Sequence, residues 1–367
     1  MAKGLYIGVD GKARKVKKIY TGINGKARKV KKGYIGIDGK ARLFFSGEKK
    51  LSYYGTATAL TTARAYLAAT SISDYAIFYG GYNGTYDFKN MDIYNSSLAK
   101  VTNNSSGSIS KLAAASNSNY AMFGGGKDDG VNSAESTVRA IDENLTTTFT
   151  SFTNVARFSL AATTVNDYVL FGGGDNNKDY YCETVDAFDT DLVKSTATAL
   201  SEGRSQLAAT TVGNYALFGG GFNRIAFFVA TVDAYDTNLV KSTATALSEA
   251  RTRLAATTIR NYALFGGGGA TVDAYDTNLT RTTATPLSQA RSSLAATTVG
   301  DYALFGGGNA TVDAYDTDLV KSTATPLSVS RSDLAATTIG NYALFGGGRN
   351  GNNDSKVVDV YQVSESN

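Results

Sequence analysis

The chain has 367 residues, of which 43% are hydrophobic and 11% aromatic, enough apolar side chain for a large buried core. It contains one cysteine, no histidine and no tryptophan, which excludes an intrachain disulfide and every catalytic or metal site that depends on imidazole. The net charge of +4 conceals an asymmetry, because residues 1–50 carry +12 and residues 51–367 carry −8, which predicts two modules with different partners.

Residues 1–50 form a basic arm that repeats every 14 residues. Its three units share the pattern Y-x-G-x-[DN]-G-K-A-R, and the Asp-Gly or Asn-Gly pair in each unit is a strong signal for a β-hairpin. Isolated hairpins are marginally stable in water, so we expect this ribbon or solenoid of hairpins to need the second module, another copy or a partner. The residues expected to attach the arm are Tyr6, Lys15, Tyr20, Lys29 and Tyr34.

These units resemble the short repeats in tail and other structural proteins of phages and prophages of Gram-positive bacteria. The resemblance implies attachment to other tail proteins of a virion through residues 1–50. Two alternatives stay open: a solvated charged hairpin without a partner, and nucleic-acid binding by the lysines, for which no recognisable fold is present. The start lacks the apolar segment of a signal peptide and no run reaches transmembrane length. We therefore expect synthesis in the bacterial cytoplasm, no membrane insertion and a place in the virion tail.

Residues 51–367 contain seven copies of a phrase in which tyrosine and apolar residues precede glycines. The copies are spaced by 40 to 48 residues and begin at Tyr75, Tyr120, Tyr168, Tyr215, Tyr262, Tyr302 and Tyr342. One period holds four strand-like segments rich in Thr, Val, Tyr and Ala, at 204–212, 214–221, 231–236 and 243–247. Four antiparallel strands in such a period make one propeller blade. We therefore predict an all-β, seven-bladed β-propeller preceded by the small hairpin arm.

The order of segments at the two ends predicts how the ring closes. The module begins with a lone fourth-strand segment, 56–60, and finishes with a third strand, 357–361. We expect 56–60 to complete the last blade. The first strand of each blade, as in 207–209, should line the central channel with small side chains, and the second should be apolar on both faces. Pro286 and Pro326 are expected on outer strands, where a missing N–H is tolerated.

The repeat resembles the kelch family of β-propellers. The shared features are a glycine pair after a Y-x-x-F strand, the V-x-x-Y-D pattern of 232–236, and an arginine before the inner strand. That arginine is Arg64, Arg157, Arg204, Arg251, Arg291 or Arg331. The sequence departs from the family in lacking the outer-strand tryptophan and in having Ile109 at the arginine position of blade two. We interpret the repeated arginine and aspartate as structural, because a site rarely needs six copies of one residue.

Catalysis is not indicated. Copper or iron enzymes on kelch propellers need histidine, the sialidase motif needs tryptophan, and no G-x-S-x-G, P-loop or CxxC motif occurs. Cys182 has no histidine to activate it and should be inert. No metal site or cofactor is predicted. Four loop carboxylates could hold Ca²⁺: Asp128, Asp129, Asp175 and Asp179. The simpler interpretation is that they are solvated side chains.

The connections between second and third strands vary most, and they should all emerge on one face. They are minimal in blades five and six and longer at 82–90, 127–137, 175–184, 222–230 and 349–356. Binding is commonly built on such loops. The expected ligand-binding residues are Tyr82, Tyr86, Phe88, Tyr180, Tyr181, Phe222, Arg224, Phe227 and Phe228. The apolar run 225–229 is either an exposed contact site or a strand extension packed on the next blade.

The sequence thus suggests a non-enzymatic tail-associated protein of a phage or prophage. The arm would join it to the particle, and the propeller loops would bind a host-surface glycan or protein. The alternative is a purely structural protein that decorates or bridges parts of the virion.

Overall fold

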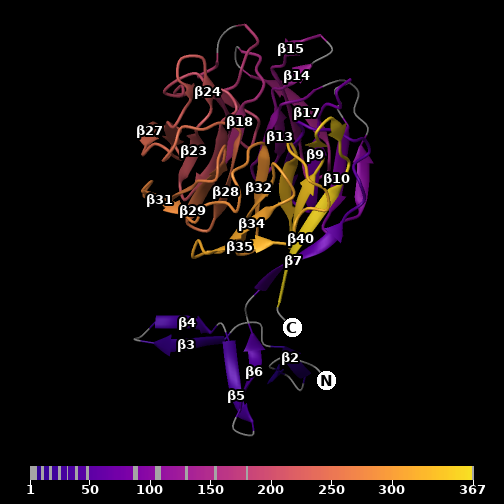
Figure 1. Cartoon of the computed structure of the whole chain (residues 1–367), viewed down its shortest axis with the longest axis vertical. Helices are drawn as coiled ribbons and strands as arrows, with labels where there is room; N and C mark the ends of the chain where they lie inside the picture. Colours follow the sequence, from indigo (N-terminus) through magenta and orange to yellow (C-terminus); the bar gives the residue numbers. More distant parts are fainter. Residues whose placement is uncertain are drawn as a thin grey trace. The chain divides into compact units, whose positions relative to one another are not determined.

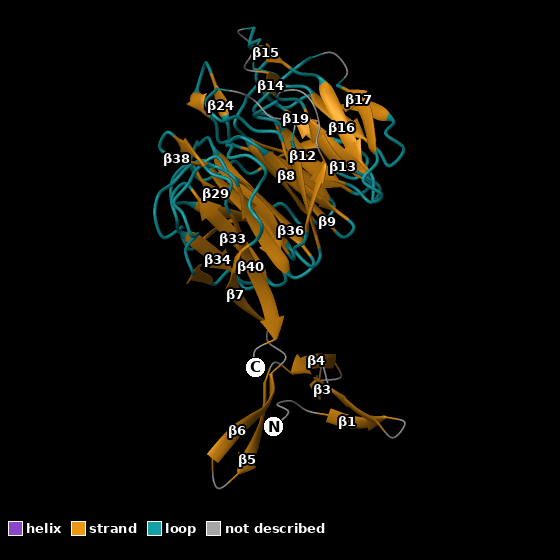
Figure 2. Cartoon of the chain, turned by 90° about the vertical axis from the view of Figure 1, so that its right-hand side faces the viewer, coloured by secondary structure: helices purple, strands orange, loops and turns teal. Residues whose placement is uncertain are grey.

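The computed structural model describes residues 49–365, apart from 86–89, 104–108, 129–130, 153–154 and 179–180, together with six strands between residues 6 and 46. These residues form strands, turns and loops (Figures 1 and 2). None of them belongs to a helix long and apolar enough to cross a membrane. The chain divides into two compact units, residues 1–52 with 362–367, and residues 53–361.

The arm consists of three hairpins, as its repeat predicts. They pair β1 (Tyr6–Val9) with β2 (Lys12–Lys15), β3 (Ile19–Ile23) with β4 (Lys26–Val30), and β5 (Lys32–Ile37) with β6 (Lys40–Ser46). Each hairpin is a separate two-stranded sheet, so the expected continuous ribbon is not formed by these strands. The register places Tyr6 opposite Lys15, Tyr20 opposite Lys29, and Tyr34 opposite Leu43. The attachment role of these residues stays a prediction.

The second unit is built from seven four-stranded antiparallel sheets, each ordered from the inner to the outer strand. Blade one consists of β8 (Ala68–Ile72), β9 (Tyr75–Tyr79), β10 (Met91–Asn95) and β11 (Lys100–Asn103). Blade two consists of β12 (Ala113–Ser116), β13 (Ala121–Gly124), β16 (Thr137–Ile141) and β17 (Thr147–Ser151). Blade three consists of β18 (Ala161–Val165), β19 (Tyr168–Gly172), β20 (Val185–Phe188) and β21 (Lys194–Ala197). Blade four consists of β22 (Ala208–Val212), β23 (Tyr215–Gly219), β26 (Val232–Tyr235) and β27 (Lys241–Ala244). Blade five consists of β28 (Leu254–Ile259), β29 (Tyr262–Gly267), β30 (Val272–Tyr275) and β31 (Arg281–Ala284). Blade six consists of β32 (Leu294–Val299), β33 (Tyr302–Gly307), β34 (Val312–Tyr315) and β35 (Lys321–Ala324). Blade seven consists of β36 (Ala335–Ile339), β37 (Tyr342–Gly346), β40 (Val358–Glu365) and β7 (Lys49–Thr56).

The seven inner strands contact one another in sequence, and β36 of the last blade contacts β8 of the first, which closes the ring. The fold is a seven-bladed β-propeller, as the repeat count predicts. Three small hairpins extend the strand 2–3 connections: β14 (Lys127–Asp128) with β15 (Ser133–Ala134), β24 (Phe222–Asn223) with β25 (Phe227–Phe228), and β38 (Arg349–Asn350) with β39 (Asn353–Asp354). In both overall views β14, β15 and β24 lie at the same end of the propeller.

The closing strand was placed too late in the sequence by our prediction. β7 spans Lys49–Thr56 and pairs with β40. Residues 57–60 lie beyond the strand but still donate backbone hydrogen bonds to the last blade. The N–H of Ala57 donates to the carbonyl of Val358 (2.9 Å), and that of Leu60 donates to the carbonyl of Lys356 (2.8 Å). The T-A-T-A/P-L motif straddles the end of the fourth strand in the five blades that have it, blades three to seven, and its leucine is buried in the linker. For the same reason Pro286 and Pro326 follow β31 and β35 rather than lying within them.

Neighbouring blades share hydrophobic clusters, and the glycine triplet allows the closest approach within them. The first glycine of the triplet faces the phenylalanine of the next blade's second strand, and a Cβ on Gly172 would lie 2.7 Å from Phe218 Cε1. The same approach occurs between Gly346 of the last blade and Phe78 of the first, at 2.6 Å. Contacts this short leave room only for hydrogen. The second strands are buried on both faces, as predicted.

The repeated arginine forms six buried ion pairs, which confirms that it is structural. Its partner is the aspartate at the second position of the V-x-x-Y-D pattern, whereas the final aspartate, Asp236 in blade four, accepts hydrogen bonds from the backbone N–H groups of Asn238 and Val240 in the next turn. In blade four Arg204 donates to Asp233 (2.8 Å) and to the carbonyl of Phe218 (3.1 Å), and Asp233 also accepts from the backbone N–H and hydroxyl of Ser201. Each aspartate lies on a third strand, so the pair fixes the linker that arrives from the preceding blade. The pairs are Arg64–Asp92, Arg157–Asp186, Arg204–Asp233, Arg251–Asp273, Arg291–Asp313 and Arg331–Asp359.

Five tyrosines on third strands reinforce the same linkers. Tyr235, for example, donates its hydroxyl to the carbonyl of Thr198 at 2.7 Å. Burial raises the pKa of each phenol well above its ordinary value, and the nearby third-strand aspartate adds to the rise. These third-strand tyrosines are Tyr94, Tyr235, Tyr275, Tyr315 and Tyr361.

The exceptions to the repeat gather at the interface between blades one and two. Here Ile109 replaces the arginine, Arg139 replaces the aspartate, and Tyr79 replaces the first glycine. The Arg139 guanidinium lies 4.9 Å from the Tyr79 ring centre and 4.7 Å from that of Phe149, and Tyr79 contacts Phe123 edge to face. Cation–aromatic packing therefore takes the place of the ion pair.

Candidate functional site

In every blade the residue immediately before the leucine that leads into the inner strand has a left-handed backbone conformation, which six blades also show at a leucine in the strand 3–4 turn. All seven have φ between 53° and 58°, the left-handed region that L-residues other than asparagine and aspartate seldom adopt. Glycine would be the ordinary choice there. We call these residues the pore ring: Tyr66, Lys111, Ser159, Gln206, Arg253, Ser293 and Asp333.

The backbone of the pore ring forms a closed circle of hydrogen bonds. The N–H of each member donates to the carbonyl of its equivalent in the preceding blade, at 2.8 to 3.1 Å. The circle closes where the N–H of Tyr66 donates to the carbonyl of Asp333, at 2.9 Å. This arrangement satisfies both backbone groups of every member without using a side chain. The side chains are therefore free to differ, and six residue types occupy the seven positions.

A left-handed conformation costs an L-residue on the order of 1–2 kcal/mol. The chain bears this cost at all seven positions, although glycine is abundant elsewhere in each blade. A leucine in the turn between the third and fourth strands bears the same cost in six blades and does not line the cavity, so the pore ring is distinguished by its side-chain variation and by the cavity it surrounds. The pore ring is where the blades share a backbone and differ in side-chain chemistry.

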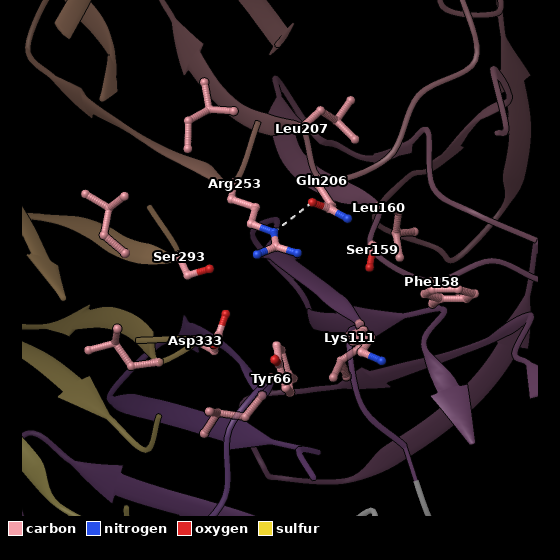
Figure 3. A pocket seen from close by; sticks show the side chains of 15 residues that line it. Tyr66, Lys111, Phe158, Ser159, Leu160, Gln206, Leu207, Arg253, Ser293 and Asp333 are labelled. Atoms are coloured by element: carbon pink, nitrogen blue, oxygen red, sulfur yellow. Dashed lines mark hydrogen bonds between the residues drawn. The ribbon is translucent and has the colours of Figure 1, made fainter. Parts of the chain in front are cut away.

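The pore ring surrounds a cavity of about 450 Å³ at the mouth of the central channel, a size typical of small-molecule sites (Figure 3). The seven leucines that follow the ring form its apolar wall, together with Phe158. The Nε of Arg253 donates to Oε1 of Gln206 at 3.0 Å, and Figure 3 shows the rest of the guanidinium directed into the cavity. The Asp333 carboxylate also points inward, and Ser332 donates to its Oδ2 at 3.0 Å.

Aromatic rings and cations form one side of the cavity. Lys111 Nζ lies 5.5 Å from the ring centre of Tyr66 and 5.9 Å from that of Phe158, and the Arg349 guanidinium lies 5.0 Å from the Tyr66 ring. Burial raises the pKa of the Tyr66 phenol, as does the charge of Asp333, while Arg349 and Arg253 oppose the rise. Tyr66 therefore presents a neutral hydroxyl at physiological pH, able both to donate and to accept.

The loops that were predicted to bind lie on the same face as the pore ring. Backbone bridges join Ala65 to Tyr82 and Ser205 to Phe222, so these strand 2–3 connections begin beside the ring. We call the pore ring and the strand 2–3 connections together the ring face. Tyr82 is half-buried on blade one. Tyr86, Phe88 and Tyr180 lie outside the described residues.

The remaining predicted residues gather at the hairpin of blade four, where Tyr181 is contributed by the strand 2–3 connection of blade three. Phe222 contacts Tyr181 at 5.7 Å between ring centres and approaches Phe227 and Phe228 at 6.1 and 6.4 Å. Arg224 is exposed beside them and helps to line a second cavity of about 340 Å³. Of the two interpretations of the apolar run 225–229, the structure favours the exposed one, because Ile225 is 94% exposed. Val229, at the end of the run, is buried.

Other candidate chemistry is absent or inert where the structure describes it. No group of three or more His, Cys, Asp or Glu side chains among the described residues could hold a metal ion. Asp129 and Asp179, two of the four carboxylates considered for Ca²⁺, lie outside these residues. Burial raises the pKa of the Cys182 thiol to about 11, which leaves it protonated near neutral pH.

The sequence prediction missed the pore ring, although a signal for it exists. In the segment 204–209, R-S-Q-L-A-A, the third position changes from blade to blade while the leucine stays. A position that varies between blades while its neighbours stay the same is one at which the fold does not require a particular side chain. No known family model matches the chain, and no curated protein matches it significantly.

Proposed function

We propose that this protein is a non-enzymatic recognition protein whose ring face binds a glycan or protein on a host cell surface. The observation that carries the proposal is that, on a repeated scaffold, the pore ring carries six residue types at seven equivalent positions and the strand 2–3 connections on the same face differ in length and sequence. Elsewhere the repeated residues serve packing. A rigid scaffold with one diversified face is the usual design of a binding module.

The chemistry of the pore ring favours binding over catalysis. It offers one arginine, one lysine, one carboxylate, a neutral phenol and small hydroxyls around an apolar wall. Such convergent polar groups fix the orientation of a ligand. Asp333 has no second carboxylate beside it in the ring with which to share acid and base roles.

The setting that we propose is the tail of a phage or prophage, with a kelch-type propeller carried by the hairpin arm. The support for this setting is the resemblance of the arm repeats and of the blade motifs described above. The arm would attach to other tail proteins, and pairing with a second copy through the arm is compatible with its hairpins. The propeller would then act in host recognition.

The test is direct binding of the full chain to Gram-positive cells and to purified wall glycans, measured by sedimentation with fluorescently labelled protein. We expect saturable binding to at least one host surface. Absence of binding across a broad panel would refute the proposal, and so would turnover of a bound glycan, because the proposal assigns no reaction to the ring.

A second candidate function, decoration or bridging of the virion, is favoured by the exposed hairpin of blade four. Ile225, Phe227 and Phe228 are 94%, 64% and 53% exposed, and apolar patches of this kind commonly mark contacts with other proteins. High-resolution imaging of the particle separates the two functions. A ring face buried against another virion protein would support decoration, and a ring face directed to solvent would support recognition.

A further inference from the structure

We infer that the pore-ring cavity binds an acidic saccharide, holding its carboxylate or phosphate on Arg253 and its hydroxyls on Asp333. The inference rests on the proposed function and adds the class of ligand and the residue that selects it.

The geometry of Arg253 is the first argument. Its only side-chain hydrogen bond to the described residues runs from Nε to Gln206, and the tether leaves both terminal amino groups directed into the cavity. A guanidinium presents its donors as a planar fork that fits carboxylate and phosphate oxygens in pairs. Because Gln206 already fixes its orientation, little conformational freedom remains to be lost when an anion binds.

The charge around the cavity is the second argument. Arg253 and Lys111 contribute positive charge to the lining, against the single carboxylate of Asp333. Lys127 and Arg349 add positive charge behind the aromatic rings of Phe158 and Tyr66. Arg349 is paired with Asp354, which neutralises part of this contribution. Within the lining itself, two cationic side chains against one carboxylate give a net positive formal charge, which favours an anion.

The position of Asp333 narrows the ligand further. It faces the cavity with an orientation fixed by Ser332, and a carboxylate repels a bare polyanion but accepts hydrogen bonds from hydroxyl groups. A ligand that satisfies both Arg253 and Asp333 must carry an oxyanion and hydroxyls on one small frame. Tyr66, Phe158 and the leucines supply an apolar wall for the C–H face of a sugar ring. An acidic monosaccharide at the end of a glycan has these features.

The experiment measures binding of three probes to the full chain by calorimetry: a glucuronic-acid-terminated oligosaccharide, its glucose-terminated counterpart, and glycerol 3-phosphate. A charged hydrogen-bond pair is worth about 1.5–3 kcal/mol, so we expect the better acidic probe to bind at least about tenfold more tightly than the neutral sugar. The uronate and phosphate arms distinguish the two sources of the oxyanion.

The key variant is Arg253→Gln, which places at this position the residue that blade four already carries in the same conformation at Gln206. It should remove the preference for acidic probes while leaving the thermal unfolding midpoint unchanged. Arg260→Gln is the matched control, because Arg260 is an exposed arginine with φ 47° at the other end of β28, in the turn to β29. It should leave binding unchanged.

The outcomes separate the inference from the proposed function. Unchanged preference in Arg253→Gln, or equal affinity for neutral and acidic probes, overturns the inference while binding to cells can persist. Loss of acidic-probe binding in Arg253→Gln but not in Arg260→Gln supports it. If none of the three probes binds, the inference is wrong, and binding to whole cells then decides the proposed function separately.

Discussion

Replacing one buried aspartate should destabilise the propeller far more than breaking an equally short ion pair on its surface. Asp233→Asn keeps the shape of the side chain and removes its charge, which leaves the buried Arg204 with only the more distant and partly exposed carboxylate of Glu202, at 3.9 Å, as a counter-charge. Both partners are fully buried, and their atoms lie 2.8 Å apart. Removing one partner of a buried pair costs about 3–5 kcal/mol.

The matched control is Asp301→Asn. Asp301 pairs with Arg260 at 2.6 Å, but the two side chains are 45% and 62% exposed, and exposed pairs contribute about 0–1 kcal/mol. Equilibrium urea denaturation, followed by tyrosine fluorescence because the chain has no tryptophan, measures both free energies of unfolding. Losses that are equal within error, or a loss below about 1 kcal/mol for Asp233→Asn, would refute the structural role of the six pairs.

Three further predictions concern packing and titration. Gly172→Ala should lower the free energy of unfolding by about 1–3 kcal/mol, because the new Cβ would collide with Phe218. Gly269→Ala should be tolerated, because no atom lies nearer than 3.9 Å to its Cβ position. Equal losses in the two variants would contradict this prediction. The five third-strand tyrosines keep their protons in the folded state above pH 10, where the unfolded chain loses them. Stability should therefore fall as pH rises past 10, with phenolate absorbance from these residues appearing only on unfolding; early ionisation in the folded state would argue against their burial. Cys182 should be alkylated slowly at neutral pH in the native protein and rapidly in denaturant, and comparable rates would show that the thiol is accessible.

The number of blades could be predicted from the sequence because each blade repeats the same solution to the same packing problem. The phrase beginning at Tyr215 needs apolar residues on both faces and a glycine where the next phenylalanine approaches, so it recurs with little change. The boundary of the closing strand could not be predicted as well. The motif used to place it extends beyond the strand into the linker, and hydrogen bonding, rather than composition, decides where pairing ends.

The pore ring could not be found by looking for strong side-chain patterns, because its defining property is a backbone conformation. Nothing in Ser293 or Arg253 as residue types predicts a left-handed φ; the circle of hydrogen bonds between blades imposes it. The substitutions at Tyr79, Ile109 and Arg139 were likewise separate irregularities in the sequence. They are 30 residues apart along the chain and meet only in the folded interface between two blades.

The most direct measurement uses a variant in which every member of the pore ring is serine, the residue that blades three and six already have there at the same φ. The substitutions are Tyr66→Ser, Lys111→Ser, Gln206→Ser, Arg253→Ser and Asp333→Ser. Binding of this full chain to a host surface that the unaltered protein recognises is then compared by sedimentation. We predict that the variant folds with the same circular dichroism spectrum and no longer binds. A variant that folds normally and binds with unchanged affinity would contradict the assignment of recognition to the pore ring.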